Sequence, residues 1–110
     1  MSPVTAETPG DLGALQEKAA EAAQLLRLLA NENRLLLLCH LVAEGEMTVG
    51  ALAEAVGLSQ PALSQHLAML RENGLMATRR EAQAVFYRLA DQKAARVLAL
   101  LRDLYCPPAS

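Results

Sequence analysis

The stretch that decides the fold is LSQPALSQHLAMLR, residues 58–71. Its leucines recur at i, i+4 and i+7 and therefore share one face of a helix. These leucines are Leu63, Leu67 and Leu70. Ser59 can cap this helix, and Pro61 stands in the first turn, where a missing N–H costs nothing. We therefore expect a helix over Gln60–Glu72 that turns its leucines toward a core.

A shorter helix precedes this one, and the link between them is tight. Thr48 can cap a helix that ends at about Val56, and Gly57 permits a sharp turn just beyond it. Only residues 57–59 separate the two helices. Two helices joined so closely are typical of a helix-turn-helix.

A β-hairpin is expected after the helix-turn-helix. Gly74 stops the preceding helix, and segments 75–81 and 84–89 then contain Val, Tyr, Phe and Thr in a strand-like pattern. The tip at residues 82–83 holds neither Gly nor Asn, which the tight hairpin turns prefer. We therefore expect a looser connection at the tip.

Three further helices complete the predicted fold. Their ranges are about 11–29, 32–43 and 92–105, with Asp11, Asn31 and Asp91 as caps. The apolar stripe expected for the second of them consists of Leu35, Leu38, Cys39 and Val42. The predicted order is α-α-α-α-β-β-α, a mainly α fold with a small β-hairpin (α+β) in the winged helix-turn-helix class. We expect one domain over residues 11–106, with flexible tails at 1–10 and 107–110.

The composition excludes several classes of protein. The 53% hydrophobic content excludes a disordered chain, and the 3% aromatic content leaves few rings for stacking on unpaired bases. No secretion signal or membrane-spanning run is visible, so we expect a cytoplasmic protein with reduced cysteines and no membrane partner. The net charge of −2 is divided into −5 over residues 1–58, +2 over 59–90 and +1 over 91–110. A surface that faces phosphates should therefore lie in the middle third.

The helix face opposite the leucines carries small and hydrogen-bonding side chains. They are Gln60, Ala62, Ser64, Gln65, Ala68 and Met69, with His66 at the flank. Glutamine can pair with adenine edges in the major groove, and serine can pair with several bases. The hairpin adds Arg79, Arg80 and Arg88, which are placed to reach the flanking backbone or minor groove. The polar face could simply be solvated. The tight turn before this helix and the arginines after it instead favour a face that binds duplex DNA.

Residues 58–71 resemble the recognition helix of the ArsR/SmtB family of winged-helix repressors, and residues 29–35, LANENRL, resemble that family's entry to its second helix. The resemblance covers about residues 20–106. It implies a dimer that binds inverted repeats in promoters and leaves the DNA when an inducer acts. It also implies that Ser64, Gln65 and His66 lie against DNA and that the hairpin is the wing. The first and last helices, both rich in Leu and Ala, would pair the two subunits of the homodimer.

Cys39 and Cys106 are the candidates for an inducer site. Taken alone, Cys39 is typical of a small core hydrophobe and Cys106 of an idle terminal thiol. Three segments, however, are similar to a thiol- and persulfide-sensing branch of the same family. These segments are 38–40, 81–83 and 104–106. The similarity implies that a disulfide or polysulfide bridge between the two cysteines, made by reactive sulfur or another oxidant, switches DNA binding. Because a helix C-terminus raises the pKa of a thiol, Cys106 should need activation, for which Arg102 is a candidate.

Two alternatives stay open at this point. A metal-responsive repressor of the family would show Cys-x-Cys in residues 47–52 or His in 91–105, and neither is present. A metal site would have to use both cysteines with a borrowed ligand such as His40. A winged-helix module that binds protein is the second alternative, although the polar helix face and the arginines argue against it. No nucleophilic triad, carboxylate pair or phosphate loop is present, so we expect no enzyme and no cofactor.

Overall fold

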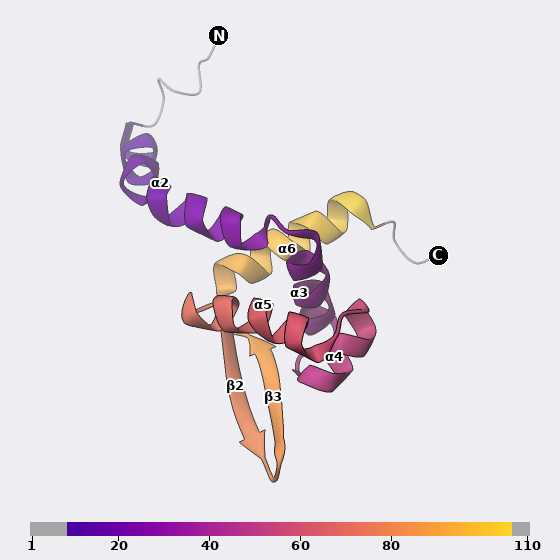
Figure 1. Cartoon of the computed structure of the whole chain (residues 1–110). Helices are drawn as coiled ribbons and strands as arrows, with labels where there is room; N and C mark the ends of the chain where they lie inside the picture. The colour runs from indigo at the N-terminus through magenta and orange to yellow at the C-terminus, as the bar shows by residue number, and fades with distance from the viewer. Residues whose placement is uncertain (1–8, 107–110) are drawn as a thin grey trace.

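The computed structural model describes residues 9–106, and its elements follow the expected order with one strand added. The helices are α2 (Pro9–Leu29), α3 (Glu32–Glu44), α4 (Val49–Val56), α5 (Gln60–Glu72) and α6 (Gln92–Tyr105). The strands are β1 (Met47–Thr48), β2 (Met76–Glu81) and β3 (Ala84–Leu89). The β2–β3 hairpin projects at one end of the molecule, α2 and α6 lie toward the other, and α3, α4 and α5 lie between them (Figure 1). This architecture confirms the predicted winged helix-turn-helix.

The capping residues that the sequence suggested hold four of the five helices. The caps are Asn31, Thr48, Ser59 and Asp91, and each side chain accepts a backbone N–H three residues ahead at 2.8 to 3.3 Å. Such a cap contributes about 1 kcal/mol of stability. The expectation for α2 is wrong, because this helix begins at Pro9 and Asp11 lies inside its first turn. Proline is well tolerated at a helix start because its missing N–H would have no intrahelical partner.

The added strand, β1, is only two residues long and pairs antiparallel with β3. Met47 lies opposite Tyr87, and Thr48 lies opposite Phe86, so that the sheet order is β1-β3-β2. Because Thr48 also caps α4, this pairing ties the middle of β3 to the start of the helix-turn-helix. The hairpin is therefore anchored along β3, while β2 forms the edge of the sheet.

The tip of the hairpin is tighter than we expected. Glu81 pairs with Ala84, which leaves only Ala82 and Gln83 in the turn. Ala82 has a φ of 55°, the left-handed conformation that glycine adopts more easily. A Cβ in this conformation costs roughly 1–2 kcal/mol. The strand register compensates for a turn sequence that does not favour it.

The core is built almost entirely from leucine, and α3 lies at its centre. Leu37, Leu38 and Leu41 of α3 are buried, together with the three leucines expected from α5. The expected stripe on α3 is borne out in part, because Leu38 is buried and the other three residues are only partly buried against the core. Leu37 and Leu41, which the stripe did not include, are fully buried instead. Residues 35–38 are four consecutive leucines, so the sequence pattern alone does not fix which side of α3 faces inward.

The two outer helices leave large apolar side chains uncovered in the single chain. Those of α2 are Leu12, Leu15 and Leu26, and those of α6 are Leu100, Leu104 and Tyr105. Leu104 is 65% exposed and Tyr105 is 80% exposed. Clusters of this kind in a monomer usually mark a surface that another molecule covers. Within residues 9–106, no helix is long and apolar enough to cross a membrane.

Candidate nucleic-acid interface and cysteine pair

Helix α5 separates its core residues from its polar residues cleanly. Leu63, Leu67 and Leu70 are at most 2% exposed. On the other face, the exposed side chains are Gln60, Ser64, Gln65, Ala68 and Met69. Ser59 fixes the first turn by accepting the N–H of Ala62 at 3.3 Å. This face can offer hydrogen-bond donors and acceptors to a base-pair edge without moving the core.

His66 does not share the exposure of its neighbours on α5. The ring is half-buried, and its Nδ1 lies 3.5 Å from Nη1 of Arg34, a residue of α3. Burial, and then the charge of Arg34, lower the pKa of His66 below its ordinary value. Both effects favour the neutral ring, which accepts a hydrogen bond at Nδ1 when its proton is on Nε2.

Arg34 is the residue that our sequence analysis missed. Its Nε donates to the carbonyl of Leu28 at 2.6 Å, and its Nη2 donates to the carbonyl of Arg27 at 3.2 Å. These carbonyls belong to the last turn of α2. A signal was present, because Arg34 is the third residue of α3, and a cation in the first turn is disfavoured by the helix dipole unless it has other partners.

The wing arginines have different surroundings. Arg79 donates from Nε to both carboxylate oxygens of Glu46, at 2.8 and 3.0 Å, and from Nη1 to Glu81 at 2.9 Å. Its guanidinium also lies over the ring of Phe86, 4.6 Å from the centroid. These contacts raise the pKa of Arg79 and lower that of Glu46. Arg80 points to the opposite face of β2 because side chains alternate along a strand.

Arg80 and Arg88 are exposed, and neither forms an ion pair with any other residue of the described range 9–106. The charge of Arg88 contributes to the lowered pKa of Glu46. The structure thus leaves Arg80 available to a phosphate, whereas Arg79 would first have to give up two carboxylates. Arg79 and Arg80 both remain predicted DNA contacts. Of these two, Arg80 is the one that has no carboxylate partner among residues 9–106.

The two cysteines lie on neighbouring helices, and both are free thiols. Cys39 is half-buried on α3, and Cys106 is exposed at the C-cap of α6, where its N–H donates to the carbonyl of Arg102 at 2.9 Å. The pKa of Cys39 lies above its ordinary value, and burial is the largest cause. The charge of Arg102 opposes this rise, and Cys106 adds to it. These effects require the three groups to lie near one another. Arg102 is thus a charged group that acts on Cys39, and its activation of Cys106 stays a prediction.

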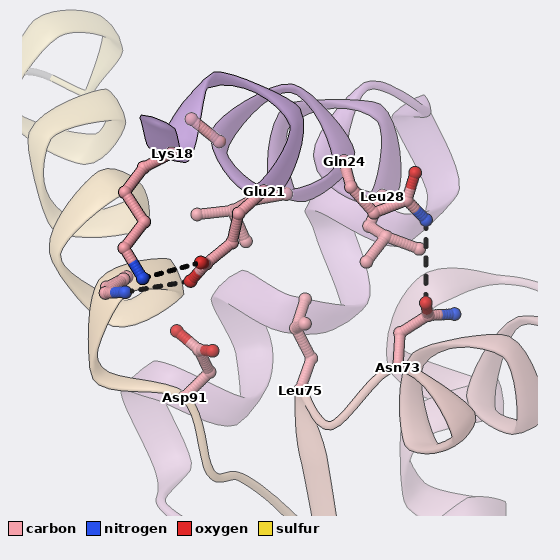
Figure 2. A pocket seen from close by; sticks show the side chains of 10 residues that line it. Lys18, Glu21, Gln24, Leu28, Asn73, Leu75 and Asp91 are labelled. Atoms are coloured by element: carbon pink, nitrogen blue, oxygen red, sulfur yellow. Dashed lines mark hydrogen bonds and ion pairs between the residues drawn. The ribbon is translucent and has the colours of Figure 1, made fainter. Parts of the chain in front are cut away.

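A hollow of about 410 Å³ separates α2 from the end of α5 and the start of α6 (Figure 2). At one side Glu21 pairs with Lys18 at 3.6 Å and with Lys93 at 3.1 Å. At the other side Nε2 of Gln24 donates to Oδ1 of Asn73 at 3.5 Å. None of the predicted site residues lines this hollow, and its rim carries both charge signs, so we do not assign it a ligand.

In the part of the chain that the structure describes, no three His, Cys, Asp or Glu side chains gather as a metal site would require. His40 is half-buried beside Cys39 in the sequence of α3. The described residues therefore add nothing in favour of the metal-responsive alternative.

Comparison with known proteins gives a consistent result. Residues 31–78 match the sequence profile of bacterial regulatory proteins of the arsR family. The chain is 47% identical to the biofilm growth-associated repressor of Agrobacterium fabrum, over 93% of this chain and 91% of that protein. It is also 47% identical to the transcriptional activator HlyU of Vibrio cholerae, over 89% of this chain and 90% of HlyU. The crystal structure of the transcriptional repressor BigR from Xylella fastidiosa, 43% identical, superposes with a TM-score of 0.80 over 87% of this chain and 97% of BigR.

We expect Arg102 to control how readily Cys39 ionises. Replacing Arg102→Gln removes a nearby cation that lowers the pKa of Cys39, so the thiol should titrate at a higher pH. Iodoacetamide labelling of Cys39 against pH, in a Cys106→Ser background, measures this. Arg96→Gln, an exposed cation elsewhere on α6, is the matched control. An identical pH–rate profile for the two arginine variants would contradict the assignment.

Proposed function

The chain belongs to the arsR family of bacterial regulatory proteins and is a DNA-binding transcriptional regulator rather than an enzyme, and we propose that it is a dimeric repressor released from its operator by dithiol oxidation. Two of the three relatives described above are named repressors, which supports repression as the mode of action. The observation that carries DNA binding is the two-sided character of α5.

Direct readout is assigned to the exposed face of α5. We propose that Gln60, Ser64 and Gln65 contact base edges in the major groove, and that Arg80 contacts a flanking phosphate. Since a bound phosphate could replace its carboxylate partners, Arg79 stays in the proposed contact set. The DNA contact of His66 stays a prediction that we do not build on, because the half-buried ring already contacts Arg34. Glutamine and serine supply donors and acceptors that fit base edges, whereas arginine supplies charge that fixes register on the backbone.

A second copy of the chain would cover the apolar faces of α2 and α6. The exposed leucines and Tyr105 on these helices supply the surface that a subunit interface needs. Residues 11–106 would then form one unit of dimerisation and DNA binding. Two-fold symmetry would present two α5 helices about 34 Å apart, one turn of DNA, which fits an inverted-repeat operator.

The inducer is proposed to act on Cys39 and Cys106. Two thiols and one persulfide, RSSH, yield the Cys39–Cys106 disulfide, the thiol RSH and H₂S. The thiols are oxidised and the sulfur–sulfur bond of the persulfide is reduced. Insertion of further sulfane sulfur would give a polysulfide chain instead. The supporting observation is that Cys106 and Arg102 both lie close enough to Cys39 to affect its pKa.

Such a bridge would join α3, which packs in the same core as α5, to α6, which belongs to the proposed subunit interface. Cys39 belongs to α3, whose leucines pack in one core with those of α4 and α5. Cys106 ends α6. Tethering the two would change the spacing of the paired α5 helices. A coupling of roughly 1–3 kcal/mol would lower DNA affinity about 5- to 150-fold.

The base and phosphate contacts make separate predictions. Gln65→Ala should cost about 1–3 kcal/mol of binding free energy at the preferred base and relax selectivity there, because the lost hydrogen bonds read sequence.

Arg80→Gln should weaken binding to all duplexes and reduce the slope of log affinity against log salt by about one. Titration with duplexes from upstream of the protein's own gene measures both effects. Arg96→Gln is the control, and equal losses on specific and unrelated DNA for Gln65→Ala would contradict base readout.

The redox switch is tested by comparing reduced and persulfide-treated protein in the same titration. The treated wild type should bind its operator about 5- to 150-fold more weakly. Cys39→Ser and Cys106→Ser should each keep their affinity after treatment, because neither can close an intramolecular bridge. Intact mass distinguishes loss of two hydrogens from gain of whole sulfur atoms. Unchanged affinity of a wild type shown by mass to be bridged would refute the switch.

A further inference from the structure

We propose that Arg34 is a positioning residue for DNA binding, which holds the recognition helix α5 against the last turn of α2 through His66. The inference rests on the proposed function, since it concerns how the reading helix is oriented. It assigns to His66 a role within the protein rather than at the DNA surface, and it assigns a role to Arg34, which our sequence analysis did not single out.

The guanidinium of Arg34 connects three helices at one point. The residue itself belongs to α3, near its N-terminus. Two of its nitrogens donate to carbonyls in the last turn of α2, those of Arg27 and Leu28, at 3.2 and 2.6 Å. The last carbonyls of a helix have no intrahelical donor and carry partial negative charge, so a cation stabilises them. These two bonds fix the guanidinium in place.

The third contact reaches α5. Nη1 of Arg34 lies 3.5 Å from Nδ1 of His66, a long hydrogen bond that depends on the neutral ring carrying its proton on Nε2. The lowered pKa of His66 is consistent with that neutral form. His66 sits between Gln65, which is exposed, and Leu67, which is buried. A shift of His66 therefore moves the proposed reading face directly.

Besides the leucine core that α2 and α5 share, a second polar link joins α2 to the end of α5. It is the hydrogen bond from Gln24 to Asn73, which lies on the surface at one side of the 410 Å³ hollow (Figure 2). The contact from Arg34 to His66 has the same length of 3.5 Å, but it is partly buried and its guanidinium is held by two shorter bonds. Three of the five guanidinium N–H groups of Arg34 therefore face protein acceptors.

Acid should weaken this connection. Among the elements packed against His66, the charged group that affects its pKa is Arg34. Protonation of the ring would place two cations side by side and would remove the hydrogen-bond acceptor at Nδ1. The contact is present above the pKa of His66 and is lost as the pH falls through it. A histidine that contacts phosphate would behave in the opposite way, because its protonation would strengthen DNA binding.

The test measures operator affinity of the reduced protein between pH 5.5 and 8, and its salt dependence at pH 7.5. Arg34→Gln should bind about 5- to 150-fold more weakly with an unchanged salt slope. On acidification the wild type should lose affinity relative to His66→Gln, which keeps an acceptor and does not titrate. Arg27→Gln removes a neighbouring exposed charge whose side chain donates to Gln24, and this variant should match the wild type in both measurements.

A measurement without DNA covers the case in which Arg34→Gln folds poorly or the wild type binds no duplex. The pKa of His66, followed by NMR in the wild type and in Arg27→Gln, should stay below its ordinary value in both. In any folded Arg34 variant it should rise. A wild type that ignores every duplex would refute the proposed function. Wild-type affinity in Arg34→Gln, a salt slope reduced by one, or acid-strengthened binding relative to His66→Gln would each overturn the positioning role alone.

Discussion

The structure depends on the burial of one leucine face of α5 in the leucine core that it shares with α3 and α4. Leu63, Leu67 and Leu70 are almost wholly removed from solvent, and removing one such side chain from a core costs about 2–5 kcal/mol. This burial fixes the rotation of α5 about its own axis. Once the rotation is fixed, Ser64 and Gln65 have only one direction available, which is outward. The polar face is therefore oriented by apolar packing rather than by contacts of its own.

Helix α3 carries the features that could make DNA binding adjustable. Its buried leucines share the core with those of α5. Its half-buried Cys39 lies near Arg102 and Cys106, which affect the pKa of its thiol. Arg34, in its first turn, contacts α2 and α5. A covalent change at Cys39 would thus act on the middle of α3, and a protonation at His66 would act on its first turn through Arg34. Both signals would change the angle of α5, although one is an oxidation and the other a protonation.

Local signals in the sequence predicted the fold well, and long-range polar contacts were beyond them. Caps such as Ser59 and Asp91 act on residues three positions away, so their effect can be predicted from the sequence alone. The strand β1 was missed because two residues cannot show a period, and it exists only through its pairing with β3. The pairing of Arg79 with Glu46, 33 positions apart, and the contact of Arg34 with His66, 32 apart, depend on the folded arrangement. On α3, four consecutive leucines left the inward direction undetermined until the neighbouring helices were in place.

The central claim is that the outward face of α5 lies against base pairs, and photo-crosslinking tests it most directly. A benzophenone amino acid at Gln65, in the reduced full chain, should crosslink to bases inside the bound duplex. The same probe at Arg96, an exposed position on α6, should give no crosslink. A protein that binds the duplex but crosslinks only from Arg96 would contradict the account, because DNA would then meet a different face of the molecule.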